Sequence, residues 1–160
     1  MAKNPTTARI WIAWRVFLRL LVGLYWLYFS SQKWFNNAWV KPILDGAAST
    51  NPIRTVGIIL RDFVIPNWQP ITTSQTILEA AIGTLLLIGL FTRVSGILGT
   101  LLASTLLVTF LGSIDAPVFI WFYLLSASAS LTVAISDAGK SLGLDSLLEK
   151  KWPNPRLNAW

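Results

Sequence analysis

The chain has 160 residues, of which 54% are apolar and 12% are charged, whereas about 25% of the residues of an average soluble protein are charged. This composition excludes a water-soluble surface, and the nine Trp residues suit the membrane–water interface. The chain contains no His or Cys and one Met, so we expect no protein-ligated metal or haem. The net charge of +6 comes from basic residues that set membrane orientation, and we expect no nucleic-acid partner.

Four stretches are long and apolar enough to cross a bilayer. A spanning helix needs about 20 residues, because it rises about 1.5 Å per residue through about 30 Å of hydrocarbon. The later stretches are joined by short connections, which force neighbouring helices to be antiparallel. The sequence therefore predicts an all-α integral membrane protein, a single domain over residues 1–160 folded as an antiparallel four-helix transmembrane bundle in the lipid bilayer. The predicted spans are residues 10–29, 73–92, 94–114 and 116–136.

The connection between the first two spans is long enough to contain structure of its own. Asn51 followed by Pro52 is typical of a helix start. The residues that follow separate into an apolar and a polar side at helical spacing, which predicts an amphipathic interfacial helix over residues 52–65 on the outer face. The apolar side is Ile53, Val56, Leu60, Phe63 and Val64, and the polar side is Arg54, Arg61 and Asp62.

A weaker amphipathic pattern follows the last span, over residues 141–152. It predicts a short helix with one apolar and one polar face. The apolar residues are Leu144, Leu147 and Leu148, and the polar residues opposite them are Asp145, Glu149 and Lys150.

The basic residues near the ends of the spans predict the orientation of the chain. Cytoplasmic segments carry an excess of Lys and Arg, so we expect both termini in the cytoplasm and a multi-pass protein of the cytoplasmic membrane. The first connection opposes this assignment, since it also carries basic residues at positions 33, 41, 54 and 61. The residues that support it are Lys3, Arg9, Arg93, Lys140, Lys150, Lys151 and Arg156.

Arg15 and Arg19 interrupt the first span one helical turn apart. Counted from residue 10, Arg19 lies about 13 Å deep, near the midplane of the bilayer. An arginine at that depth costs at least about 2.5 kcal/mol on insertion, whereas Arg15 can extend its side chain to the inner interface. We therefore expect a functional or buried, paired role for Arg19. The same side of the helix continues through Trp26 to Lys33.

Glu79 is the one charged residue inside the second span. An intramembrane carboxylate is protonated, paired or directed into a polar cavity. Two alternatives remain open, both with Arg19 and Glu79 facing the bundle interior. Either the two side chains form an ion pair that joins the first two helices, or they frame a polar ligand with two carbonyls, such as a quinone. Arg19, Glu79 and Trp26 are the candidate cofactor-binding residues, and no catalytic residue is assigned.

Small residues recur every fourth position in the third and fourth spans. In lipid, such stripes let two helices approach closely, so we expect them to form helix contacts. The stripes are Ser95, Gly99 and Ala103; Gly96, Thr100 and Ser104; and Ser126, Ser130 and Ala134.

Three segments resemble the DoxX-like membrane proteins: RLLVG at residues 19–23, EAAIGTLLLIGLFTR at residues 79–93 and DAGKSLGLD at residues 137–145. The Trp-rich first span and the long first connection are closer to the DoxD branch, the larger subunit of thiosulfate:quinone oxidoreductase. The resemblance implies a bacterial or archaeal inner-membrane subunit near the quinone pool. The family positions it implies are Arg19, Lys33, Glu79, Arg93, Asp137 and Asp145.

Three functions remain open. The first is a subunit of a quinone-dependent oxidoreductase, in which electrons pass directly between substrate and quinone or through a partner, because the chain has no nucleotide motif. The second is an accessory subunit that packs against other membrane subunits of a larger respiratory or photosynthetic complex. The third is a small transporter, which is weakest because the sequence has no inverted repeat or broken helix. Whether the chain is an enzyme is therefore not decided by the sequence.

Overall fold

The computed structural model describes residues 5–113, 116–136 and 138–151 of the chain. Within these residues every regular element is a helix, and four helices are long and apolar enough to cross a membrane. The prediction of an all-α protein with four such segments is confirmed. They are α1 (Pro5–Trp34), α4 (Trp68–Ile88), α5 (Thr92–Thr109) and α6 (Ala116–Ile135).

The ends of these helices differ from the predicted spans for local reasons. The second span was expected to continue to residue 92, but α4 ends at Ile88 because Gly89 adopts a left-handed backbone with φ of 69°. The same helix begins at Trp68 rather than residue 73, since Pro70 is tolerated in a first turn. The helix α5 stops at Thr109, where Phe110 leaves the helical conformation.

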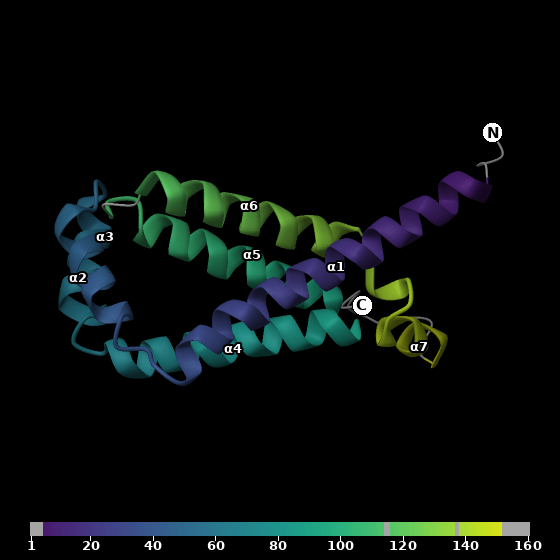
Figure 1. Cartoon of the computed structure of the whole chain (residues 1–160), viewed down its shortest axis with the longest axis horizontal. Helices are drawn as coiled ribbons and strands as arrows, with labels where there is room; N and C mark the ends of the chain where they lie inside the picture. The colour runs from purple at the N-terminus through teal and green to yellow at the C-terminus, as the bar shows by residue number, and fades with distance from the viewer. Residues whose placement is uncertain (1–4, 114–115, 137, 152–160) are drawn as a thin grey trace.

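The long helices associate as two pairs, α1 with α4 and α5 with α6 (Figure 1). Ser30 of α1 bonds to Thr76 of α4, and Gly23 faces Gly83, so the two helices run past each other in opposite directions. A Cβ atom added at Gly83 would lie 2.8 Å from the carbonyl oxygen of Gly23, which explains why glycine is needed where the two backbones meet.

The second pair is held together by the predicted small-residue stripes. Gly96 lies against the backbone of Ser130 and Ala134, and Gly99 lies against the Ser130 side chain. The predicted helix contact between these stripes is therefore confirmed. The buried residues of the stripes are Ser95, Gly96, Gly99, Ala103, Ser126, Ser130 and Ala134.

Three shorter helical segments cover one end of the two pairs, called here the outer end (Figure 1). They are α2 (Val40–Thr50), α3 (Arg54–Ile59) and the π-helix η1 (Leu60–Val64). The sequence prediction of one helix over residues 52–65 missed α2 altogether. Its apolar residues Val40, Ile43 and Leu44 recur at helical spacing, a signal that was present in the sequence.

The predicted apolar side of residues 52–65 divides between the core and the surface. Leu60 is buried against Leu44 of α2 and Leu106 of α5, whereas Phe63 and Ile53 are exposed. The helix also changes to π geometry at Leu60, which turns the residues after it relative to a regular α-helix.

The segment after α6 lies at the opposite, inner end and contains a 3-10 turn, η2 (Ala138–Lys140), and α7 (Leu144–Lys151). The predicted polar side of residues 141–152 is exposed at Glu149 and Lys150 but not at Asp145. Asp145 is fully buried, whereas Leu147 is 58% exposed. The reason is that Asp145 bonds to the start of α5 instead of facing water. Asp137, Trp152 and the Leu148 side chain lie outside the described residues.

Candidate functional site

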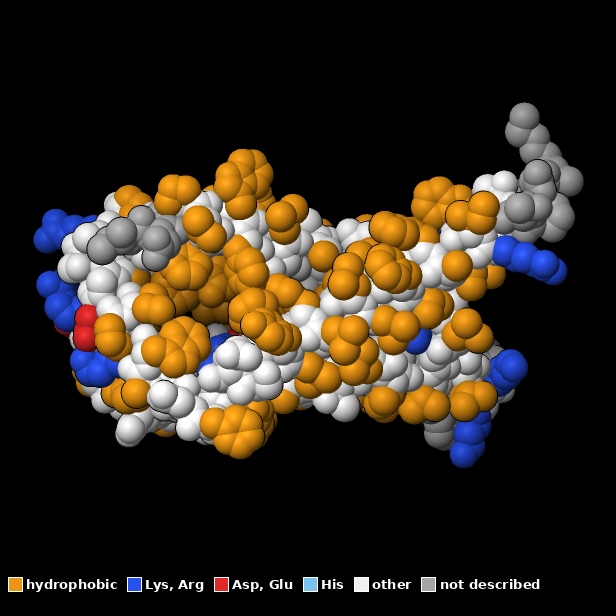
Figure 2. All heavy atoms as spheres, viewed as in Figure 1, with side chains coloured by type: hydrophobic (Ala, Val, Ile, Leu, Met, Phe, Trp, Pro, Cys, Tyr) orange, Lys and Arg blue, Asp and Glu red, His pale blue; other side chains and the backbone are white. Residues whose placement is uncertain are grey.

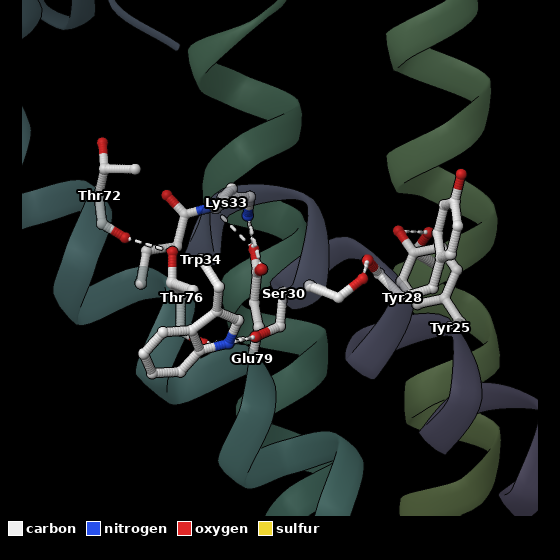
Figure 3. Close-up of polar contacts among 11 residues, drawn as sticks. Tyr25, Tyr28, Ser30, Lys33, Trp34, Thr72, Thr76 and Glu79 are labelled. Atoms are coloured by element: carbon white, nitrogen blue, oxygen red, sulfur yellow. Dashed lines mark hydrogen bonds and ion pairs between the residues drawn. The ribbon is translucent and has the colours of Figure 1, made fainter. Parts of the chain in front are cut away.

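A buried ion pair joins the outer part of α1 to α4 (Figure 3). The Nζ atom of Lys33 lies 2.5 Å from each carboxylate oxygen of Glu79. Gln75, one turn before Glu79, donates a hydrogen bond of 2.9 Å to the same carboxylate. Lys33 stands in the last turn of α1, where its long side chain reaches across to α4. The two side chains are 9% and 2% exposed, so the opposite charges are almost fully removed from solvent.

Hydroxyl and indole groups continue this polar contact along the same two helices (Figure 3). Ser30 donates a hydrogen bond of 3.0 Å to the Thr76 carbonyl and accepts one of 3.0 Å from the Trp34 indole. Thr76 in turn donates to the Thr72 carbonyl. These bonds satisfy the polar groups beside the ion pair and hold α1 and α4 in register.

A cavity of about 350 Å³, called here the aromatic chamber, opens beside the ion pair between α1 and α6. Figure 2 shows it as a hollow with hydrophobic walls and with charged atoms at its edge. Its aromatic rings pack on one another. The ring centroid of Phe122 lies 5.0 Å from that of Phe29 and 5.5 Å from that of Tyr25. Its lining residues are Tyr25, Trp26, Phe29, Lys33, Trp39, Ile43, Glu79, Leu106, Phe110, Val118, Phe119, Phe122 and Tyr123.

A second cavity of about 260 Å³, called here the aliphatic chamber, lies between α4, α5 and the outer segments. Branched aliphatic side chains make up about half of its lining residues, and three threonines add hydroxyl groups. Lys33, Trp39, Ile43, Leu106, Phe110 and Tyr123 belong to both chambers. The remaining lining residues are Val40, Leu44, Leu60, Val64, Ile71, Thr72, Gln75, Leu102, Thr105 and Thr109.

Trp26, a candidate from the sequence, lines the aromatic chamber and is 1% exposed. Its indole N–H donates to the Ser130 hydroxyl at 3.3 Å, and its ring meets Tyr25 edge to face. The indole nitrogen is therefore already satisfied, and Trp26 offers its ring to the chamber.

Arg19 and Glu79 are both buried, as predicted, but the ion pair proposed between them is wrong. Arg19 donates hydrogen bonds of 3.0 to 3.2 Å to the carbonyls of Ala138, Ser141 and Leu142. Its guanidinium lies beside Gly89, at the turn between α4 and α5. That turn is ten residues along α4 from Glu79, or about 15 Å, which is too far for contact. Arg19 lines neither chamber.

Asp145 forms the second half of this inner-end cluster. Its carboxylate accepts hydrogen bonds from the backbone N–H groups of Phe91 and Thr92 and from the Thr92 hydroxyl, at 2.6 to 3.0 Å. It therefore caps the start of α5, where a negative charge is favourable. Arg19, residues 89–92 and residues 138–145 belong to the three segments used for the family resemblance, and the fold brings them together here.

The sequence did not identify Lys33 as the partner of Glu79, nor the aromatic residues of α6 as the wall of a chamber. No three His, Cys, Asp or Glu side chains gather as a possible metal site in the part of the chain that the structure describes. Comparison of the chain with family models, with curated proteins and with solved structures found no match. The fold itself defines the class, a helical multi-pass membrane protein in contact with lipid.

Proposed function

We propose that this chain binds a quinone in the aromatic chamber, with one ring carbonyl at the Lys33–Glu79 pair. The observation that carries the proposal is a buried ion pair at the edge of a cavity lined mostly by aromatic side chains. An ammonium group has three N–H donors, and two of them are used on the Glu79 oxygens. The third can donate to a carbonyl oxygen of a ligand.

The walls of the chamber suit a planar ring. Aromatic side chains such as Trp26, Phe29 and Phe122 favour stacked or edge-to-face contact with another ring. A volume of about 350 Å³ lies within the range of about 300–1,000 Å³ that small-molecule sites occupy. Arg19 is left out of this site, because its guanidinium already binds three carbonyls at the inner end.

In this proposal the chain is a DoxX- or DoxD-like subunit of a bacterial or archaeal cytoplasmic membrane that serves quinone-linked electron transfer. The four long helices form an antiparallel transmembrane bundle with both termini in the cytoplasm, and α3 with η1 lies along the outer surface. The residues of this chain bind and orient the ring and exclude water. Electrons come directly from a substrate or from a partner subunit.

A second candidate function is that of an accessory subunit, and the first part of α1 favours it. This part extends beyond the other long helices (Figure 1). Trp11, Trp14 and Phe17 on it are all more than half exposed. Large apolar side chains that the rest of the chain does not cover need lipid or another protein around them. Other membrane subunits of a respiratory or photosynthetic complex would fit this segment.

Titration of the detergent-purified protein with menadione, followed by tryptophan fluorescence, tests the first candidate. We expect saturable quenching, because Trp26 and Trp39 line the chamber. Lys33→Met should weaken binding about tenfold or more, the cost of one hydrogen bond to a charged group. Lys41→Met, the same change in an exposed pair, is the matched control. Absence of quenching, together with co-purification of a stoichiometric larger complex, would favour the accessory subunit.

A further inference from the structure

The aromatic and aliphatic chambers meet at Lys33, and their linings differ in chemistry. We propose that the aliphatic chamber holds the isoprenoid tail of a prenylated quinone whose ring occupies the aromatic chamber. This inference rests on the proposed function and adds the part of the ligand that lies beyond the ring.

The linings divide according to the two parts of such a molecule. Phe29 and Phe122, from α1 and α6, line only the first chamber, whereas Leu60, Val64 and Ile71 line only the second. The aromatic residues Trp39, Phe110 and Tyr123 belong to both. Flat side chains match a planar ring, and branched aliphatic side chains match the methyl-branched units of an isoprenoid chain.

The position of the ion pair determines where the tail begins. In a prenylated quinone, the tail is attached to the ring carbon next to a carbonyl carbon. A ring that presents to Lys33 the carbonyl next to its tail therefore has its tail attachment at the boundary between the chambers, since Lys33 lines both. From there the tail can enter the aliphatic chamber.

The benefit of this arrangement is selection by shape rather than hydrophobic burial. A tail in the bilayer is already in an apolar medium, so moving it into the protein removes little apolar surface from water. An unfilled apolar space, however, deprives the side chains around it of dispersion contacts. A tail in the cavity of about 260 Å³ would restore those contacts, and a ligand without a tail would not.

The test compares menadione with the same ring carrying a geranylgeranyl tail. Ile71→Phe and Val64→Phe each narrow the aliphatic chamber and should weaken binding of the tailed quinone about tenfold, a typical cost of overpacking. Binding of menadione should change less than about twofold, because its ring stays in the aromatic chamber. Ile77→Phe and Val94→Phe, the same changes at exposed positions of α4 and α5, are the matched controls.

A second measurement uses the unmodified protein and so does not depend on the folding of variants. A tailed quinone with a photoreactive diazirine at the end of its tail should label peptides that contain Val64 or Ile71. Labels confined to α1 and α6, or equal loss of both quinones in the two variants, would overturn the tail assignment while menadione binding stands. If neither quinone binds the unmodified protein, the proposed function and the tail assignment are overturned together.

Discussion

The Nζ atom of Lys33 lies 2.5 Å from each carboxylate oxygen of Glu79, and Gln75 bonds to the same carboxylate. Each of these charges alone would be costly in this position, because both side chains are almost fully buried. Their contact therefore makes the end of α1 and the middle of α4 dependent on each other. It also places a charged, hydrogen-bonding group at the edge of the aromatic chamber.

The first prediction concerns the mutual dependence of these two charges. Glu79→Gln should lower the free energy of unfolding by about 3–5 kcal/mol, because it leaves the Lys33 ammonium buried without a counter-charge. Adding Lys33→Met should recover part of this loss, since the double variant has no uncompensated charge. Thermal or denaturant unfolding in detergent, followed by tryptophan fluorescence, measures both effects.

The exposed pair of Lys41 and Asp45 provides the control for this experiment, with N–O distance 2.8 Å. Asp45→Asn should change stability by less than about 1 kcal/mol, as is usual for pairs at the surface. Additive effects of Glu79→Gln and Lys33→Met, with no recovery, would contradict the coupling.

The second prediction concerns the crossing of α1 and α4. A Cβ atom at Gly83 would lie 2.7 Å from Leu27 Cγ and 2.8 Å from the Gly23 carbonyl oxygen, so Gly83→Ala must push the helices apart. We expect a loss of about 1–3 kcal/mol in unfolding free energy, in the range of other overpacked cores.

Gly46→Ala is the matched control, because a Cβ atom there would meet nothing within 4 Å. Within α2, alanine should be neutral or stabilise the helix by up to about 1 kcal/mol. If Gly83→Ala were as stable as Gly46→Ala, the close approach of the two helices would be wrong.

The sequence predicted the spanning helices well, because a bilayer requires long apolar stretches and the composition has few charges to interrupt them. It could not predict the pairing of Arg19, Lys33 and Glu79. Which charged groups meet depends on the axial offset of one helix relative to the other, and the close contact of Gly23 with Gly83 belongs to that offset. Counting depth from residue 10 placed Arg19 near the midplane of the bilayer, although α1 extends well before and beyond the predicted span.

The inner end shows a different limit of sequence reasoning. The pattern of residues 141–152 put Asp145 on a polar side. Helical spacing takes account only of the residues within the segment and not of other parts of the chain that contact it. The unpaired N–H groups at the start of α5 provide a better partner than water, and the carboxylate turns inward to them. Such a cap contributed from outside the helix leaves no local pattern in the sequence.

The third prediction tests this cap. Asp145→Asn removes the charge that accepts hydrogen bonds from Phe91 and Thr92, and we expect a loss of about 1.5–3 kcal/mol, as for other hydrogen bonds to charged groups. Backbone amides of residues 138–151 should exchange hydrogen for deuterium faster. Glu149→Gln, on the exposed side of the same helix, should leave that exchange unchanged. Equal exchange in the two variants would argue against the cap.

The fourth prediction concerns Arg19, the other half of the inner-end cluster. Arg19 donates hydrogen bonds from two guanidinium nitrogen atoms to three carbonyls, and the single ammonium nitrogen of lysine cannot reproduce this planar arrangement. Arg19→Lys should therefore speed amide exchange in residues 138–142 and lower the melting temperature, whereas Arg15→Lys should have little effect on either. Binding of menadione by Arg19→Lys should persist at the temperature where it remains folded, since Arg19 lines neither chamber. If Arg19→Lys stayed folded but no longer bound menadione, Arg19 would again be a candidate ligand-binding residue.

The last prediction concerns orientation in the membrane. The chain has no Cys, so a single introduced cysteine can be labelled without background. Ser49 and Glu149 are exposed and lie in α2 and α7, at opposite ends of the molecule (Figure 1). Because Lys150 and Lys151 adjoin Glu149 and cytoplasmic segments carry an excess of basic residues, we expect α7 to lie inside. A membrane-impermeant maleimide should therefore label Ser49→Cys in intact cells and label Glu149→Cys only after the membrane is permeabilised. The reverse pattern would invert the bundle and place the aromatic chamber in the cytoplasmic half of the membrane.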